Sequence, residues 1–371
     1  MLLTKPSADF PLENARACPD WFFADANAAG YYAVSYEGAW AEKLVTHGLP
    51  HLKPDESAAA LRNVQFLFSS ALGDPREELA SVREFSRSSD PGLARQAAGT
   101  IAGISDFVSA DQDREYAVLL QSLYAKRARE LGWKPQPDEP QETRLLRIDI
   151  VPLVATCGED AELQSQASQL AREWLKDRHS LDPDMVTPVL STAAWNGDRA
   201  FFDLLVDAIK KTKIQRERLW MIDTLSSFRD PAISQAALNL LFGSGIDPRE
   251  LQYVLFGALR ENRQIVWNFV QENFDRLNST LPGARGIPFG AILPQTASGF
   301  CDAQHQTEVE TFFQSRIPKL PGGARNLANT LERIRLCSAR AAVVEPAITD
   351  FLNSYYQTRN GDSDAFRPGS H

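Results

Sequence analysis

The 371-residue sequence contains only four cysteines, five histidines and three methionines, and the small number of cysteines excludes several classes of protein. No two cysteines form a Cys-x-x-Cys pair, because they lie far apart at Cys18, Cys157, Cys301 and Cys337. This spacing predicts unpaired, buried thiols in a reducing compartment rather than a disulfide framework or a zinc site. No run approaches the ~20 apolar residues of a membrane helix, and the start lacks the apolar run of a signal peptide. We therefore expect a cytoplasmic location and no membrane partner.

Positive charge is also scarce, since the formal net charge is -9. Nucleic acid is therefore not an expected partner, because its phosphates require a clustered basic face. One basic stretch stands out at residues 210–220, "KKTKIQRERLW". It is interpreted either as cations that stabilise a helix C-terminus or as an anion site for a peptide carboxylate or an acidic partner. We favour the first interpretation, because most charge runs form solvated faces.

Motifs for catalysis are missing as well. The sequence has no phosphate-binding loop, no dinucleotide fingerprint and no nucleophile elbow. His47 and His51 have the spacing of two zinc ligands on one helix face, but Pro50 lies between them and no Glu follows His47. Because proline breaks a helix, the geometry of a zinc site cannot form there. The sequence thus predicts no catalytic residue and no metal ligand on this chain.

Helical patterns make up most of the chain after residue 40. Asp-Pro pairs occur at 74–75, 90–91, 182–183, 230–231 and 247–248, each before an amphipathic run. Asp is a good N-cap and Pro suits the first helical position, so each pair predicts a helix start. Further helices are predicted at 54–71, 113–131, 141–156, 160–178, 184–196, 198–211, 214–228, 263–278, 303–315 and 324–339.

The number and length of these helices predict a mainly α fold. Short connections favour antiparallel helix pairs stacked side by side, as in a HEAT-like or armadillo-like α-solenoid. An irregular helical domain is the alternative, because no residue-level consensus accompanies the repeated caps. The front of the chain differs, since Tyr32, Val34 and Tyr36 alternate with smaller residues. That period predicts a β-strand, and with the preceding aromatic run it indicates a short N-terminal β-hairpin over residues 20–37.

The segment "DWFFADANAAGYYAVSYEGAW" resembles the junction between the β-sandwich and the C-terminal helical domain of zinc-dependent aminopeptidases of the puromycin-sensitive and endoplasmic-reticulum type. The positions that match are Trp21, Asn27, Gly30, Tyr31, Tyr32, Val34 and Tyr36. The resemblance continues in order along the chain. The later matches include "LRNVQFLFSSAL", "VLSTAAWNGDRAFFDLL" and "NRQIVWNFVQENFDRL", the last with Arg263, Trp267 and Asn273 at family positions and Phe274 where the family has Trp.

The resemblance implies a division into a partial β segment at 1–37, a C-terminal helical aminopeptidase-like domain at 38–357 and a disordered tail at 358–371. It also implies a role in enclosing the active site and binding the distal end of peptides when the chain is paired with a separate catalytic half. The family's zinc and substrate-amine motifs are not in this sequence. We therefore expect zinc in the catalytic domain, no cofactor on this chain, and no hydrolysis by this chain alone. A stand-alone helical-repeat scaffold that binds its own protein partner is the alternative function.

Arg260 is the candidate peptide-binding residue. In the family, basic residues on the concave face hold the far end of the peptide, and a C-terminal carboxylate favours a bidentate Arg. Arg260 ends the run "PRELQYVLFGALR", just before the matching "NRQIVWNFV". The alternative interpretation is a solvated Arg that satisfies the carbonyls at its own helix end.

Overall fold

The computed structural model describes residues 17–283, 286–317 and 319–364 and confirms the mainly α fold, with no β-strand in those ranges. The chain divides into two compact units, residues 1–85 and 86–371. The first unit holds α1 (Trp40–Lys43), the π-helical turn η2 (Leu44–Gly48), α2 (Pro54–Ser70) and most of α3 (Pro75–Ser86). The helices of the second unit are α4 (Pro91–Gly103), α5 (Asp113–Leu131), α6 (Gln141–Ala155), α7 (Ala161–Lys176), α8 (Pro183–Trp195), α9 (Arg199–Lys211), α10 (Gln215–Thr224), α11 (Pro231–Asn239), α12 (Pro248–Leu251), α13 (Arg263–Thr280), α14 (Ala303–Gln314) and α15 (Gly323–Asp364). Short 3₁₀ turns connect them, of which η4 (Ile104–Phe107), η6 (Leu225–Ser227), η7 (Gln252–Leu255) and η8 (Arg260–Asn262) lie near the site described below.

The predicted β-hairpin at residues 20–37 is wrong. This segment has no strand ladder, and several of its backbone N–H groups donate to side chains. The Asn27 amide donates to Glu56 Oε1 at 2.8 Å and the Val34 amide donates to Asn63 Oδ1 at 3.2 Å, and both acceptors are side chains of α2. Of the two alternating tyrosines, Tyr36 contacts the ring of Phe22, whereas Tyr32 is exposed.

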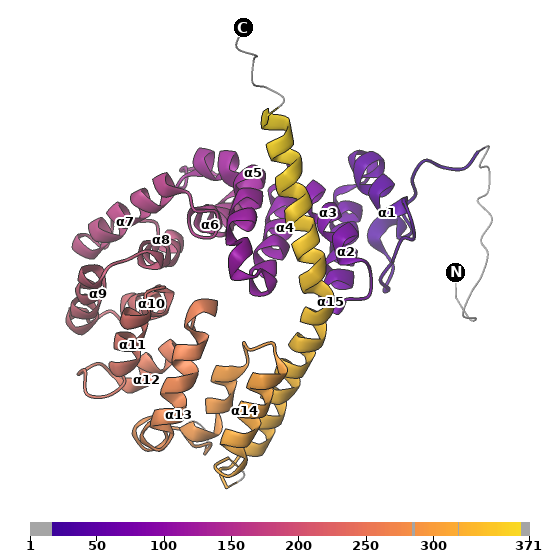
Figure 1. Ribbon diagram of the computed structural model, residues 1–371. Helices are drawn as coiled ribbons and strands as arrows, with labels where there is room; N and C mark the ends of the chain where they lie inside the picture. The colour runs from indigo at the N-terminus through magenta and orange to yellow at the C-terminus, as the bar shows by residue number, and fades with distance from the viewer. Residues whose placement is uncertain (1–16, 284–285, 318, 365–371) are drawn as a thin grey trace. The chain divides into compact units, whose positions relative to one another are not determined.

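The second unit consists of two layers of helices that follow a curved path (Figure 1). In one layer α6 contacts α8 and α8 contacts α10. The other layer contains α7 and α9. Of these, α7 packs against α6 and α8 of the first layer, and α9 packs against α10 of the first layer. Figure 1 shows the first layer on the inner side of the curve and the second on the outer side. Successive helices thus pack as neighbours, whereas the regular repeat of an α-solenoid stays a prediction.

The Asp-Pro pairs begin helices, as predicted. Proline is the first residue of α3, α4, α8, α11 and α12, and the preceding aspartate accepts a backbone N–H in every case. These bonds satisfy amides that have no partner inside the helix, which stabilises each helix by about 1 kcal/mol. The pairs therefore fix where five helices begin.

The long helix α15 joins the end of the second unit to its beginning. It contacts both α14 and α5, and Thr349 Oγ1 of α15 donates to Gln112 Oε1 at 2.9 Å. A disulfide between Cys301 and Cys337 also ties the segment before α14 to α15. The prediction of unpaired thiols is therefore wrong for this pair, because two cysteines 36 residues apart meet only through the tertiary fold. Cys18 and Cys157 are free.

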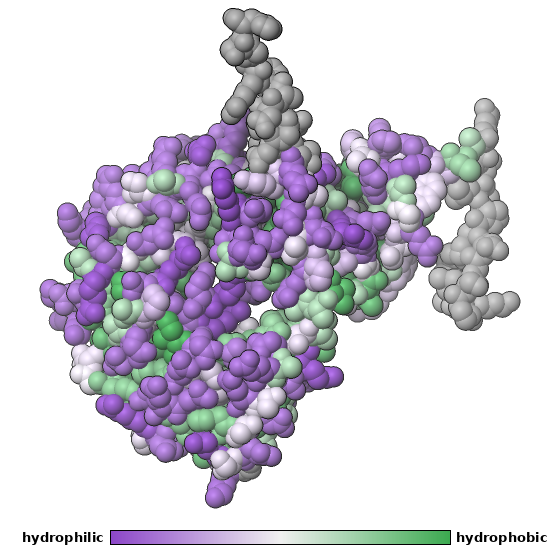
Figure 2. All heavy atoms as spheres, in the orientation of Figure 1, coloured by the Kyte–Doolittle hydropathy of each residue, from purple (hydrophilic) through white to green (hydrophobic). Residues whose placement is uncertain are grey.

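Hydrophilic residues cover most of the face shown in Figure 2, and hydrophobic residues form short, separate stretches on it. No helix within the described ranges is both long enough and apolar enough to cross a membrane. The cytoplasmic location stays a prediction, and so do the domain boundaries at residues 37 and 357. Residues 365–371 of the predicted tail lie outside the described residues.

Candidate functional site

A cavity of about 320 Å³ lies in the second unit, and we call it the arginine cavity. Its wall comes from five segments that are distant in sequence, within residues 105–116, 156–159, 195, 229 and 258–263. Most of these residues lie where one helix ends and the next begins. Because loop ends carry polar side chains and unpaired backbone groups, the curved packing of the helices brings charged groups together here.

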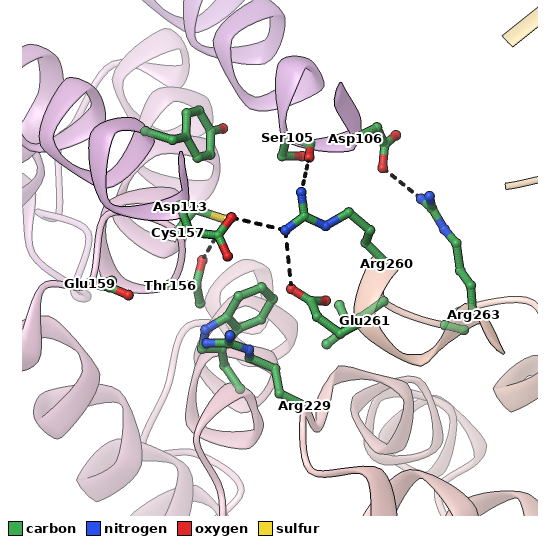
Figure 3. A pocket seen from close by; sticks show the side chains of 14 residues that line it. Ser105, Asp106, Asp113, Thr156, Cys157, Glu159, Arg229, Arg260, Glu261 and Arg263 are labelled. Carbon is green, nitrogen blue, oxygen red and sulfur yellow. Dashed lines mark hydrogen bonds and ion pairs between the residues drawn. The ribbon is translucent and has the colours of Figure 1, made fainter. Parts of the chain in front are cut away.

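Arg260 lines this cavity, and its guanidinium holds together two segments about 150 residues apart. Nη1 donates to the carbonyl oxygens of Ser105 at 2.7 Å and Val108 at 2.5 Å. Nη2 donates to Asp113 Oδ1 at 3.0 Å and lies 4.0 Å from Glu261 Oε1 (Figure 3). The sequence placed Arg260 at a peptide site, and the structure places it on a cavity wall but with a carboxylate already bound. Its role in peptide capture therefore stays a prediction.

Arg263 makes a second link of the same kind. Its Nη2 donates to Asp106 Oδ1 at 2.7 Å and its Nη1 donates to the Gly299 carbonyl at 2.9 Å. A Cβ atom at position 299 would lie 2.8 Å from Arg263 Nε, so the glycine permits this close approach. Arg260 in η8 and Arg263 at the start of α13 thus hold the connection between α4 and α5.

Two charged side chains of the cavity have no hydrogen bond and no ion pair to any described residue: Arg229 and Glu159. The guanidinium of Arg229 lies over the ring of Trp195, 5.0 Å from its centroid. Glu159 is exposed and has a positive φ of 55°, a backbone conformation that is uncommon for residues other than glycine. Figure 3 shows both side chains without a partner among the residues drawn. The cavity therefore offers one uncommitted cation and one uncommitted anion to a ligand.

The polar neutral groups of the cavity favour binding over covalent chemistry. Burial raises the pKa of the Cys157 thiol, and burial also raises the pKa of the Tyr116 phenol well above its usual value. Both groups are therefore protonated at neutral pH, and a protonated thiol is a weak nucleophile. The Tyr116 hydroxyl is already engaged, since it donates to the Ile101 carbonyl at 3.0 Å.

The described residues offer no ligand set for zinc. No group of three or more His, Cys, Asp or Glu side chains in the described ranges could hold a metal ion. His47 hydrogen-bonds to Asp20, and His305 stacks on Phe300 while its ring nitrogens contact Asp302 and Gln264. We still predict that the chain alone holds no cofactor and hydrolyses no peptide.

The basic stretch at 210–220 lies away from the arginine cavity. Arg218 is bound in two places to Glu250, with distances of 2.6 Å and 2.7 Å. Arg216 stacks on Trp220, 4.9 Å from the ring centroid. Lys210 and Lys211 lie in the last turn of α9, where a helix C-terminus favours cations. The choice between the two interpretations of the stretch stays a prediction.

Sequence reasoning missed Arg229 and Glu159. Arg229 directly precedes the Asp230 cap of α11, and Glu159 directly precedes the Asp160 cap of α7. A charged residue directly before a helix N-cap belongs to no periodic sequence pattern, so the sequence does not mark it as part of a site. The positive φ of Glu159 is a structural signal that no sequence pattern carries.

Comparisons with known proteins identify relatives of the chain. A family model described as "ERAP1-like C-terminal domain" matches residues 21–336. The chain is 24% identical over 330 residues to "Aminopeptidase M1" of Arabidopsis thaliana, which covers 85% of this chain and 36% of the relative. It is 24% identical to "Aminopeptidase M1-B" of Oryza sativa subsp. japonica, covering 91% of this chain and 39% of the relative. It is also 24% identical to "Endoplasmic reticulum aminopeptidase 2" of Bos taurus, covering 80% of this chain and 32% of the relative. The chain thus spans between about a third and two fifths of the length of these relatives.

Proposed function

The chain belongs to the ERAP1-like C-terminal domain family, and from this premise we propose that it binds the distal end of peptides and encloses the active site of an aminopeptidase catalytic half. The observation that carries this proposal is the arginine cavity, because it lies in the family-matched region and presents an uncommitted Arg229. The relatives are named aminopeptidases, so a peptide is the ligand class that this proposal assigns to the cavity.

The proposed ligand group in the cavity is the C-terminal carboxylate of the peptide. Arg229 is half-buried and pairs with no carboxylate in the described ranges, so its fork of N–H donors is available for a bidentate contact. Stacking on Trp195 orients the guanidinium and limits the entropy lost on binding. Arg260 contributes less to carboxylate binding than Arg229, because three of its N–H donors are already used. Both arginines lie in a partly closed space, where a charge pair is stronger than in bulk water.

Binding of a short synthetic peptide, labelled with fluorescein at its N-terminus, tests the proposal by fluorescence anisotropy on the whole chain. We expect the peptide with a free C-terminal carboxylate to bind more tightly than its C-terminal amide, by about tenfold to a hundredfold. This range corresponds to a charge-assisted hydrogen bond of about 1.5–3 kcal/mol. The difference should shrink as salt is added, because the cavity is only partly closed and salt screens the charge pair.

Arg229→Gln should remove most of the difference between acid and amide. Arg216→Gln is the matched control, because Arg216 also stacks on a tryptophan at nearly the same distance but lies outside the cavity. The control should bind the acid as the wild type does. Equal affinities for acid and amide in the wild type would reject carboxylate capture.

A further inference from the structure

A groove of about 490 Å³ runs between the inner helices α6 and α8. From α6 it is lined by Ile148 and Pro152, which are four residues apart and therefore lie on one helix face, and Thr156 directly after the helix also lines it. From α8 the lining residues run from Asp184 to Trp195 and include Pro188. The groove thus has a proline from each helix in its wall.

Each of these prolines lacks the backbone N–H that a helix residue normally donates. Pro152 lies inside α6 and Pro188 lies inside α8, and neither has an N–H to donate to the carbonyl four residues earlier. The carbonyls that lose this donor belong to Ile148 and Asp184, and both residues line the groove. A proline inside a helix costs about 3 kcal/mol relative to alanine, and in both helices the residue whose carbonyl loses this helical donor lines the groove.

Hydroxyl groups add to the polar character of the groove. The side chains of Thr187 and Ser191 have no hydrogen-bond partner within the described parts of the chain, and both line the groove. Thr192 Oγ1 is buried and has no partner among the described atoms. Asp184 is the only charged residue in the described lining. The groove therefore has uncommitted hydrogen-bonding groups without a concentration of charge.

The groove continues into the arginine cavity. Thr156, Trp195 and Leu259 line both spaces. A peptide whose carboxylate lies at Arg229 would therefore have its preceding residues over α6 and α8. An extended chain advances about 3.3 Å per residue and presents an N–H at every residue, so its backbone supplies donors at short intervals.

We propose that the groove binds the main chain of the peptide, with the carbonyls of Ile148 and Asp184 accepting backbone N–H groups of the residues that precede the C-terminus. This inference rests on the proposed function and assigns the neighbouring part of the ligand. Recognition through the backbone makes binding depend on peptide N–H groups rather than on particular side chains.

A scan of N-methylated peptides tests the inference on the whole chain. The probe is the fluorescein-labelled peptide with a free carboxylate, with one backbone N–H replaced by N-methyl in each analogue. We expect one or two positions near the C-terminus to lose about two- to tenfold in affinity, the range for one net hydrogen bond. The other positions should bind as the parent peptide does.

Two variants connect the sensitive positions to the two carbonyls. Pro152→Ala and Pro188→Ala restore the helical donor, so each should abolish the effect of N-methylation at one position. Pro346→Ala is the matched control, because Pro346 also lies inside a helix but is exposed on α15 and outside the groove. It should leave the scan unchanged. Circular dichroism on each variant confirms that the helical content is retained.

The outcomes separate the two proposals. If acid and amide differ but no N-methyl position matters, or if the groove variants leave the scan unchanged, the groove assignment is wrong and carboxylate capture stands. If the peptide does not bind, or binds equally as acid and amide, carboxylate capture fails and the groove assignment fails with it.

Discussion

Replacing Arg260 by alanine should destabilise the second unit strongly, because this guanidinium connects segments that are far apart in sequence. The change removes donors from two carbonyls and one carboxylate. Val108 is buried and Ser105 is half-buried, so each carbonyl left without a donor costs about 1–3 kcal/mol. The Asp113 side chain is 45% exposed, and its ion pair therefore adds at most about 1 kcal/mol. Together these contributions predict a loss of about 2–7 kcal/mol in the free energy of unfolding.

Urea titration followed by circular dichroism measures this loss. Arg249→Ala is the control, because Arg249 also binds a carboxylate but does so only to Asp247, two residues earlier on an exposed helix end. The control should lose less than about 1 kcal/mol. Hydrogen exchange should also become faster at residues 104–113 in Arg260→Ala and stay unchanged in the control. Losses that agree within about 0.5 kcal/mol for the two variants would refute the structural role assigned to Arg260.

Two further predictions concern the first unit and the disulfide. Burial, together with the charges of Asp74 and Glu77, raises the pKa of Glu78 from 4.5 to about 7, so the unit should lose stability as the pH rises from 4.5 to 7, by up to about 3 kcal/mol. Glu78→Gln should remove most of this loss in thermal melts recorded across that range, and a wild-type melting temperature that rises with pH between 4.5 and 7 would contradict the assignment. The disulfide between Cys301 and Cys337 encloses 36 residues, and its reduction should lower the free energy of unfolding by about 4 kcal/mol if the bond acts by limiting the entropy of the unfolded chain. A thermal melt that dithiothreitol leaves unchanged would show that the pair does not constrain the fold.

Local signals in the sequence predicted the helices well. The Asp-Pro caps fixed helix starts, and the range predicted at 113–131 coincides with α5. The last helix was predicted to end at residue 339, but α15 continues through Pro346 to Asp364. The pattern that extends it is the buried series Val344, Ile348 and Leu352, and the exposed Pro346 does not interrupt the packing of that face.

Tertiary contacts explain what the sequence could not predict. The alternation of Tyr32, Val34 and Tyr36 has the period of a strand, but the Val34 amide donates to the side chain of Asn63 in α2 instead of to a second strand. The arginine cavity forms only when residues near 105, 156, 229 and 260 meet. Arg260 had a signal because it precedes a family-like run. Arg229 differs only in having no hydrogen bond or ion pair to the described residues, which is apparent only once the fold is known.

The second unit is proposed to hold peptides in the arginine cavity and the adjoining groove. The most direct test is hydrogen exchange of the whole chain, measured with and without the short peptide that has a free carboxylate. We expect slower exchange on binding at residues 148–160, 184–197 and 226–231, and no such change with the C-terminal amide at equal concentration. Protection confined to the first unit, or to the exposed face of α15, would contradict it.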